Sequence, residues 1–282
     1  MNATIETHQL KKVRDDFTLG PLDVAIESGL VTAFVGHNGS GKSTLLKSIM
    51  SLVKPTSGDI QVLDTNITQS ENWKKEIAYL PQDKLGFGPF NGHQLRELIA
   101  DLYPNWDNEL FHRLVHDWNI PLSKKFHSMS PGMQQKLALA LTISRGTPIM
   151  ILDEPSAHID LASRHILFDV LSEWMEDGER TLIIATHHIE DIRKLADIIA
   201  VMKEGQLIAQ EDKDSIAQTY TQYWLTGELP NETLPGEVKR HEQSIITDQP
   251  ASFEQYLNQH DQSWFKKESL SLEDTLAFML TI

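Results

Sequence analysis

The feature that most constrains this chain is the glycine-rich stretch GHNGSGKST, residues 36–44, which lies between an apolar run and a helical pattern. The apolar run LVTAFVG (30–36) has the length and composition of a buried strand, and STLLKSIMSLV (43–53) has helical spacing. A strand that enters a G-x-x-x-x-G-K-[ST] loop and leaves as a helix is typical of phosphate-binding loops. The sequence therefore predicts a polyphosphate site at the carboxyl end of a buried strand.

The chemistry of this loop explains its composition. Glycines let the backbone bend so that successive N–H groups point into one concavity, and the positive end of the following helix adds to them. Lys42 is suited to reach the β- and γ-phosphates, and the Ser43 hydroxyl is suited to bind Mg²⁺. The predicted nucleotide-binding residues of the loop are Gly36, His37, Asn38, Gly39, Ser40, Gly41, Lys42, Ser43 and Thr44.

Another apolar run ends in two acids. PIMILDEP (148–155) places Asp153 and Glu154 at the end of a predicted buried strand, and ligands collect at the carboxyl ends of strands in parallel sheets. An acidic strand end is common by itself, and a functional role for these acids is favoured because the phosphate loop is present in the same chain. Asp153 is predicted to orient Mg²⁺, and Glu154 is predicted to take the proton from an attacking water.

Two more strand ends carry polar side chains. TLIIATHHIED (181–191) reaches His187, whose neutral imidazole is suited to contact a γ-phosphate and to hold the water and Glu154 in line. The adjacent His188 leaves the choice between the two histidines open. Gln82 follows the strand EIAYLPQ and is predicted to reach the metal or the water.

The order of the elements predicts the fold class. Residues 4–35 consist of short β segments, strand character is lost between about 84 and 147, and helical spacing takes its place there. Strands return at 148–155 and 181–187 with an amphipathic helix between them. Alternating strands and helices imply an α/β fold with a mostly parallel sheet covered on both faces.

The domain organisation follows from this pattern. We expect one domain over residues 1–210, with a helical subdomain at about 84–147, and a C-terminal extension over 211–282. The extension is acidic, begins with a linker around TGELPNETLPGE, and is expected to be mostly helical. Its role, as a regulatory or dimerisation element, stays open.

Composition excludes some functions. The formal net charge of −15 argues against a general nucleic-acid binder, which needs a basic face to neutralise phosphates. The chain contains no cysteine, which excludes disulfides and thiolate metal sites and fits a reducing compartment. The N-terminus lacks the apolar core of a signal peptide, and the apolar runs are far shorter than the roughly 20 residues that span a bilayer. We expect another chain to do any membrane crossing.

Taken together, the motifs resemble the ATP-binding subunits of ABC transporters over about residues 4–210. The resemblance rests on GHNGSGKST, Gln82 in YLPQD, SMSPGMQQKL, IMILDEP with the following SAHID, and ATHH. It implies a P-loop NTPase ABC ATPase domain, with a RecA-like parallel-sheet core, an antiparallel β subdomain and a helical insertion. It also implies ATP hydrolysis with ATP and Mg²⁺ bound. The implied catalytic residues are Glu154, His187 and Gln82, and the implied metal-binding residues are Ser43, Gln82 and Asp153.

The same resemblance explains HSMSPGMQQKLALALT, residues 127–142, because two nucleotide domains of this family face each other head to tail around two ATP molecules. Ser130 is implied to cap a helix, and Gly132 to leave N–H groups open toward the γ-phosphate bound by the opposite protomer. Asp160 is implied to take part in the same composite pocket. The implied partners are ATP, a second ABC ATPase protomer, identical or different, and a transmembrane permease subunit, with no nucleic acid.

Some residues depart from the family pattern. Residues 129–133 read Met-Ser-Pro-Gly-Met where Leu-Ser-Gly-Gly-Gln is common, and residues 157–160, Ala-His-Ile-Asp, keep only the final aspartate of the usual Ser-Ala-Leu-Asp. The missing serine is expected to weaken communication between the two pockets. An aromatic residue upstream of the phosphate loop normally stacks on adenine. Phe17 is the only aromatic there and lies late, while Val13 or Arg14 occupies the usual place, so the stacking residue stays open.

The variant signature, LYPNWD (102–107) and the C-terminal extension most resemble Gram-positive ABC ATPases of the acetoin-utilisation and bacitracin-resistance kind. That subgroup implies export through a separate membrane subunit, from a cytoplasmic, peripheral position on the inner face of the cell membrane. Phe87 and Phe90 are candidates for the contact with that subunit. The alternatives are a soluble ABC ATPase acting in translation or DNA repair, and another P-loop enzyme such as a small-molecule kinase.

Overall fold

The computed structural model describes residues 3–14, 16–84, 86–227, 229 and 232–281. The chain divides into two compact units, Met1–Gln210 and Glu211–Ile282. None of the helices in the described part of the chain has both the length and the hydrophobicity needed to cross a lipid bilayer.

A six-stranded sheet forms the centre of the first unit, in the order β10-β9-β3-β8-β7-β6. The five strands from β9 to β6 run parallel. The strands are β3 (Val31–Val35), β6 (Ile77–Leu80), β7 (Ile149–Asp153), β8 (Thr181–Thr186), β9 (Ile198–Lys203) and β10 (Gln206–Asp212). The central strands β3, β7 and β8 are buried along their whole length and mostly apolar, because both faces of the sheet are covered.

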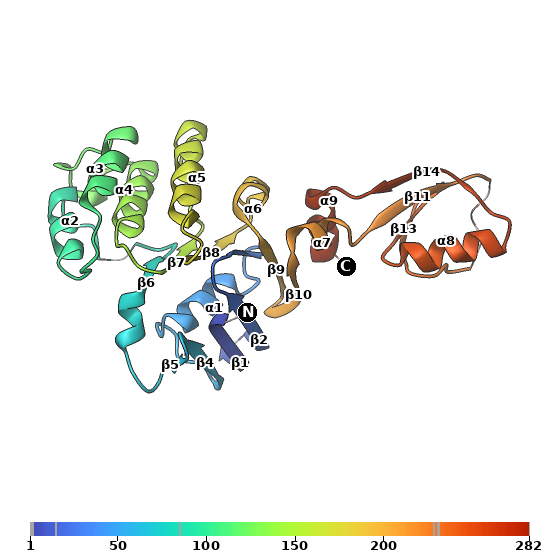
Figure 1. Ribbon diagram of the computed structural model, residues 1–282, viewed down its shortest axis with the longest axis horizontal. Helices are drawn as coiled ribbons and strands as arrows, with labels where there is room; N and C mark the ends of the chain where they lie inside the picture. Colours follow the sequence, from blue (N-terminus) through green and yellow to red (C-terminus); the bar gives the residue numbers. More distant parts are fainter. Residues whose placement is uncertain (1–2, 15, 85, 228, 230–231, 282) are drawn as a thin grey trace. The chain divides into compact units, whose positions relative to one another are not determined.

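Alternate residues of the central strands face two separate cores. Ile149 and Ile151 join the core formed with α1 (Lys42–Ile49) and an antiparallel sheet. Met150 and Leu152 join the core formed with α4 (Pro131–Ile143) and α5 (Leu161–Met175). Figure 1 shows α4 and α5 on one side of β7 and β8, and α1 with the antiparallel strands on the other. The antiparallel sheet has the order β2-β1-β4-β5 and consists of β1 (Ala3–Arg14), β2 (Phe17–Glu27), β4 (Ser57–Val62) and β5 (Thr65–Asn66).

The segment between β6 and β7 is helical, as its spacing predicts. Its helices begin at residues that satisfy the first free N–H groups: Asn91 and Gln94 form a capping box, and the Asp107 side chain accepts a hydrogen bond from Leu110. The remaining helices of this unit are the 3₁₀ helices η1 (Asn72–Glu76) and η2 (Phe126–Ser128), with α2 (Gly92–Ala100), α3 (Asn108–Asp117) and α6 (Ile189–Leu195).

The second unit corrects the prediction of a mostly helical extension, because a four-stranded antiparallel sheet forms its centre, in the order β12-β13-β11-β14. In β11, buried and half-buried residues alternate, and Tyr223 packs on Phe253 of α8 with ring centroids 4.8 Å apart. The strands are too short for their alternation to stand out in the sequence. The elements are α7 (Lys213–Ala217), β11 (Thr221–Leu225), β12 (Glu237–Arg240), β13 (Ser244–Thr247), α8 (Pro250–Gln259), β14 (Trp264–Ser269) and α9 (Leu272–Thr281).

The stretch LYPNWD packs against the end of α4. The Arg145 guanidinium donates a hydrogen bond to the Tyr103 hydroxyl at 3.2 Å and lies 5.0 Å from the centre of that ring. A Cβ on Gly146, whose φ is +63°, would lie 2.0 Å from the Asn105 carbonyl oxygen. This motif therefore has a packing role in the helical subdomain.

We predict that Gly146→Ala lowers the free energy of unfolding by about 2–4 kcal/mol, because it adds a backbone clash to the cost of a left-handed conformation. Gly178→Ala is the matched control, since Gly178 also has a positive φ, of +69°, but its Cβ would meet no atom within 4 Å. The control should lose only about 1 kcal/mol. Urea unfolding of both variants tests this, and equal losses would contradict close packing of residues 102–107 on Gly146.

Candidate active site

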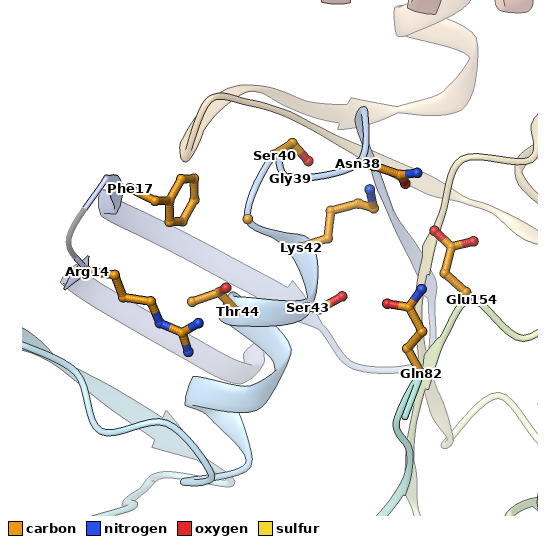
Figure 2. Close-up of a pocket in the computed structure, with 11 residues that line it drawn as sticks. Arg14, Phe17, Asn38, Gly39, Ser40, Lys42, Ser43, Thr44, Gln82 and Glu154 are labelled. Carbon is orange, nitrogen blue, oxygen red and sulfur yellow. The ribbon is translucent and has the colours of Figure 1, made fainter. Parts of the chain in front are cut away.

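A pocket of about 580 Å³ lies at the carboxyl end of β3, where the chain turns into α1. Figure 2 shows Phe17 and Arg14 on one side of Lys42, and Gln82 and Glu154 on the other. The predicted loop residues Gly36 and His37 are not among those that line it. The lining residues are Arg14, Phe17, Asn38, Gly39, Ser40, Gly41, Lys42, Ser43, Thr44, Gln82 and Glu154.

The glycines of the loop allow two close approaches. A Cβ on Gly36 would lie 2.2 Å from the Met202 carbonyl oxygen at the end of β9. Gly41 has a φ of +106°, and a Cβ there would lie 2.7 Å from the Leu19 side chain and 3.1 Å from Phe17 Cζ. The loop therefore packs closely against β9 on one side and β2 on the other, and these contacts fix the position of its backbone.

Lys42 brings a positive charge to the loop side of the pocket. Its Nζ donates hydrogen bonds to the Gly36 carbonyl at 2.7 Å and to the His37 carbonyl at 3.2 Å, and only 6% of the residue is exposed. Burial lowers the pKa of Lys42, and the charges of Glu154 and Asp153 oppose this shift. The ammonium is thus held at the loop by main-chain oxygens, and its charge is favoured by the two acids at the end of β7.

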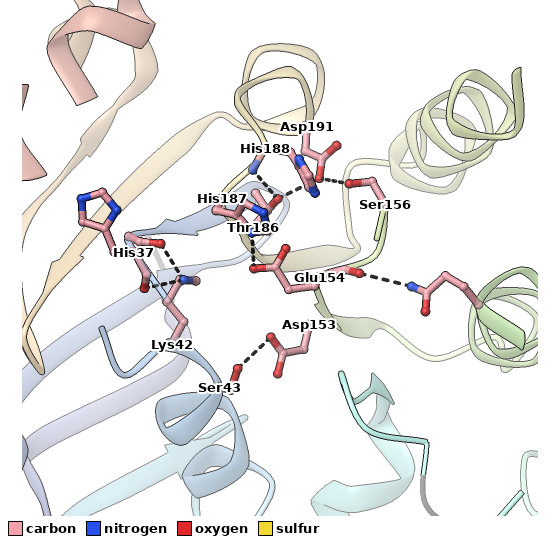
Figure 3. A network of polar contacts seen from close by, with 12 residues as sticks. His37, Lys42, Ser43, Asp153, Glu154, Ser156, Thr186, His187, His188 and Asp191 are labelled. Carbon is pink, nitrogen blue, oxygen red and sulfur yellow. Dashed lines mark hydrogen bonds and ion pairs between the residues drawn. The ribbon is translucent and has the colours of Figure 1, made fainter. Parts of the chain in front are cut away.

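Ser43 and Asp153 form a pair of oxygen ligands. The Ser43 hydroxyl donates to Asp153 Oδ1 at 3.0 Å (Figure 3). Asp153 is fully buried, and burial raises its pKa although the hydrogen bond from Ser43 lowers it. Its Oδ2 has no hydrogen-bond partner among the described residues. A buried, unpaired carboxylate oxygen beside a hydroxyl fits a hard cation such as Mg²⁺, which prefers oxygen ligands.

Glu154 and His187 meet beside this pair. Glu154 Oε1 lies 2.9 Å from His187 Nδ1, and only 6% of Glu154 is exposed. The Glu154 backbone has a φ of +53°, and its N–H donates to the Ala185 carbonyl at 2.8 Å. His187 is the histidine that hydrogen-bonds to Glu154, and the His188 ring lies 4.1 Å from the His187 ring. This arrangement places a proton acceptor at the edge of the phosphate pocket.

Gln82 lies where β6 has ended, and it lines the same pocket as Glu154. Its main-chain oxygen accepts a hydrogen bond from Lys84 Nζ at 3.1 Å. Burial lowers the pKa of Lys84, against the opposing charges of Asp83 and Asp153. The structure therefore brings Gln82, Ser43, Asp153, Glu154 and His187 to one edge of the sheet.

Ser130, Gly132 and Asp160 are not among the residues that line the pocket of their own chain. The Ser130 hydroxyl caps α4 by accepting from the Met133 N–H at 3.3 Å. A Cβ on Gly132 would lie 2.6 Å from the His158 carbonyl oxygen, so this glycine also has a packing reason within one chain. The sequence does not reveal this contact, because it shows only that Gly132 lies near the start of a helix.

Asp160 is engaged inside its own chain. It caps α5 by accepting from the Ser163 N–H at 2.9 Å, and it pairs with Lys136 Nζ at 2.8 Å. These partners, with Lys136 first, hold the pKa of Asp160 well below its usual range. The carboxylate thus links the start of α5 to α4.

Sequence reasoning missed a buried carboxylate next to Glu154 and His187. Asp191 accepts hydrogen bonds from Ser156 Oγ at 2.6 Å and from Thr186 Oγ1 at 2.8 Å, and it is 1% exposed. Ser156 follows Glu154 by two positions, and Thr186 directly precedes His187, so Asp191 joins their two chain segments (Figure 3). An acid in the first turn of a helix is ordinary, so the sequence carries little signal for this role.

Gln135 was missed as well. Its buried amide donates hydrogen bonds to the carbonyls of Glu154 at 3.2 Å and Pro155 at 2.7 Å. The helix α4 therefore contacts the main chain at Glu154 directly. In the sequence, the only indication of this role was a polar residue, Gln135, on an otherwise apolar helix face.

Comparison with known proteins decides the family. Residues 19–157 match the sequence pattern of the family described as ABC transporter. The chain is 28% identical over 217 residues to the ABC transporter ATP-binding protein YtrB of Bacillus subtilis (strain 168), covering 77% of this chain and 74% of that protein. It is 30% identical over 205 residues to the energy-coupling factor transporter ATP-binding protein EcfA2 of Lacticaseibacillus paracasei, covering 65% and 68%. The chain belongs to the ABC transporter ATP-binding family.

Solved structures agree with the family. The structure of cbiO1 from Clostridium perfringens, part of the ABC transporter complex cbiONQ, superimposes with a TM-score of 0.62 at 27% identity. It covers 77% of this chain and 92% of that one. The P-loop NTPase ABC fold predicted from the sequence is confirmed, and the chain is an ATPase subunit of an ABC transporter. A soluble ABC ATPase acting in translation or DNA repair is not favoured.

We predict that Asp191→Ala lowers kcat for ATP hydrolysis by roughly 10- to 100-fold with little change in KM, because small displacements of reacting groups cost this much. Asp191→Asn keeps an acceptor oxygen for Ser156 and Thr186 and should restore most of the rate. Glu190→Ala is the control, since it removes a neighbouring acid that pairs with Arg164 at 3.0 Å. Steady-state kinetics distinguish these outcomes, and equal rates for all three variants would contradict the role of Asp191.

Proposed function

We propose that this ATPase subunit powers export through a separate membrane subunit, and that it works as one half of an ATP-closed dimer. The observation that carries the catalytic part is the contact of 2.9 Å between Glu154 Oε1 and His187 Nδ1, at the edge of the pocket that holds Lys42. A buried carboxylate oriented by an imidazole beside a phosphate cradle has the parts required for hydrolysis of a terminal phosphate.

In this mechanism the loop binds the phosphates of ATP and Glu154 acts as the general base. The N–H groups of residues 36–44 and the Lys42 ammonium hold the β- and γ-phosphates of ATP. Ser43, Asp153 and Gln82 would hold Mg²⁺, which neutralises charge on the phosphate oxygens when bound. Glu154 takes the proton from the attacking water, and His187 keeps the carboxylate in place.

The adenine platform in this proposal is Phe17. Phe17 lines the pocket and its ring lies against the position of Gly41, so it is fixed next to the loop. Arg14 also lines the pocket, on the same side as Phe17. Val13 is 45% exposed and is not among the lining residues. We therefore assign the base to Phe17, with Arg14 beside it.

The proposed dimer is based on predicted nucleotide-binding residues that do not line the pocket of their own chain. Ser130 and Gly132 begin α4, whose first N–H groups have no acceptor within the helix and suit an anion. Met133 and Leu161, at the starts of α4 and α5, are 36% and 63% exposed. In the proposed dimer, which is a homodimer or a heterodimer, this face covers the pocket of the opposite protomer, and Asp160 lies at the same junction.

The membrane subunit would dock on the helical subdomain. Phe87 packs on Phe126, with ring centroids 5.4 Å apart, and is partly buried. Phe90, Leu98 and Leu102 are exposed at 37%, 53% and 69%, so they offer apolar surface where Phe87 does not. We assign the contact to these residues, and we propose that the subunit lies on the inner face of the cell membrane. The similarity to YtrB supports the proposed subgroup, and export is inferred from that subgroup.

We predict that Glu154→Gln lowers the rate of ATP hydrolysis by roughly 10²- to 10⁴-fold, because the amide cannot take a proton from water. ATP affinity should be retained, since Lys42 and the loop are unchanged. Single-turnover hydrolysis and equilibrium binding of a fluorescent ATP analogue measure the two quantities. Glu190→Gln is the control for loss of a nearby acid, and full turnover in Glu154→Gln would remove Glu154 from this role.

We predict that Ser130→Arg binds ATP as a monomer but does not form the ATP-closed dimer, because a long cation replaces the cap at the start of α4. Sedimentation with ATP, in the Glu154→Gln background, measures the dimer. Ser130→Ala controls for the lost cap, which alone costs about 1 kcal/mol of stability. An ATP-driven dimer of Ser130→Arg that matches the parent would contradict the composite pocket.

A further inference from the structure

Three potential metal ligands converge on the pocket edge where β7 and β8 end. Glu154, His187 and His188 each offer one ligand atom, and these atoms lie within 4.8 Å of one another. Figure 3 shows the two imidazole rings on the same side of Glu154, whereas Asp153 points toward Ser43. The cluster is thus separate from the oxygen pair assigned to Mg²⁺, although it shares the neighbourhood.

The spacing of the three groups suits a small tetrahedral cation. Ligand atoms about 2.0–2.1 Å from a tetrahedral zinc ion lie roughly 3.3 Å apart. Glu154 Oε1 and His187 Nδ1 are 2.9 Å apart, which is close to this value. The ring centroids of His187 and His188 are 4.1 Å apart and the rings are inclined by 35°, and each ring offers a nitrogen within 4.8 Å of the other two ligand atoms. The His187 side chain is 47% exposed and leaves a route for a cation to enter.

A second observation points the same way. Asp191 Oδ1 is buried and has no hydrogen-bond partner among the described residues. The charge of His188 lowers the pKa of Asp191, while burial, the largest influence, raises it. Histidines that bind a metal commonly give their other N–H to a carboxylate, which fixes the ring. Asp191 is therefore suitably placed to support His188 as a ligand.

We propose that Glu154, His187 and His188 form a binding site for a transition-metal cation of the zinc class. Two imidazoles and one carboxylate favour such a cation over Mg²⁺, and three protein ligands leave a fourth position for water. A cation bound here occupies the carboxylate oxygen and the imidazole nitrogen of the catalytic pair. This part rests on the proposed function, and it makes the site a reversible inhibitory site for ATP hydrolysis.

The test for binding uses Co²⁺ as a spectroscopic probe on the full, tag-free chain without nucleotide. We expect one Co²⁺ per chain with the visible absorption of a four-coordinate ion, displaced by one equivalent of Zn²⁺. His188→Ala should weaken this binding at least tenfold. His116→Ala is the matched control, because the side chain of His116 is 89% exposed. A six-coordinate spectrum, or equal binding by both variants, would overturn the site.

The test for inhibition measures ATP hydrolysis in excess Mg²⁺ with increasing Zn²⁺, each variant being compared with its own zinc-free rate. We expect the zinc concentration for half inhibition to rise at least tenfold in His188→Ala and to stay constant in His116→Ala. Equal sensitivity of the two variants would overturn the inhibitory role. Failure of the proposed function has a different signature, because it is full turnover by Glu154→Gln, whereas Co²⁺ binding is measured without nucleotide on the chain that retains Glu154.

Discussion

The register of three parallel strands determines the geometry of this active site. Val35 of β3 pairs with Thr186 of β8, and Asp153 of β7 pairs with Ala185 of β8. The three chains therefore leave the sheet at nearly the same level, and the phosphate loop, Glu154 and His187 follow directly. A shift of one residue in any strand would turn its apolar side chains from one core to the other. The separate packing of Ile151 and Leu152 thus secures the positions of the polar residues beyond them.

Several contacts connect the start of α4 with the segment that carries Glu154. Gln135 holds the carbonyls of Glu154 and Pro155, and Gly132 lies against the carbonyl of His158. Lys136 adds an ion pair to Asp160 at 2.8 Å. In the proposed dimer, α4 begins at the nucleotide of the opposite protomer. Any displacement of this helix would therefore reach Glu154 of its own chain through main-chain contacts, even though Ala157 stands where the family usually has a serine.

The sequence was sufficient to predict the positions of residues that lie in continuous motifs at strand ends. The meeting of Lys42, Asp153, Glu154 and His187 at one edge of the sheet was predictable because each belongs to a continuous motif at a strand end, and their roles stay predictions. The contact of Gly132 with His158 and the hydrogen bonds of Asp191 depend on packing between distant segments, so no local pattern reveals them. The strands of the second unit have four to six residues, and the buried alternation of β11 spans only Thr221–Leu225. Such short runs do not separate strand from helix, which is why the extension was predicted to be helical.

A chain with a net charge of −15 holds a polyanion because the relevant fields are local. Charges on the surface are screened over about 8 Å at physiological salt, whereas in the proposed complex the loop N–H groups and the Lys42 ammonium contact the phosphates directly. Burial lowers the pKa of Lys42, but Glu154 and Asp153 lie close enough to favour its charged form. In the proposed mechanism, Asp153 and Glu154 therefore have two effects: they make the pocket suitable for Mg²⁺, and they favour the charged form of Lys42, which binds the phosphates. The remaining negative charge disfavours nucleic acids without weakening this site.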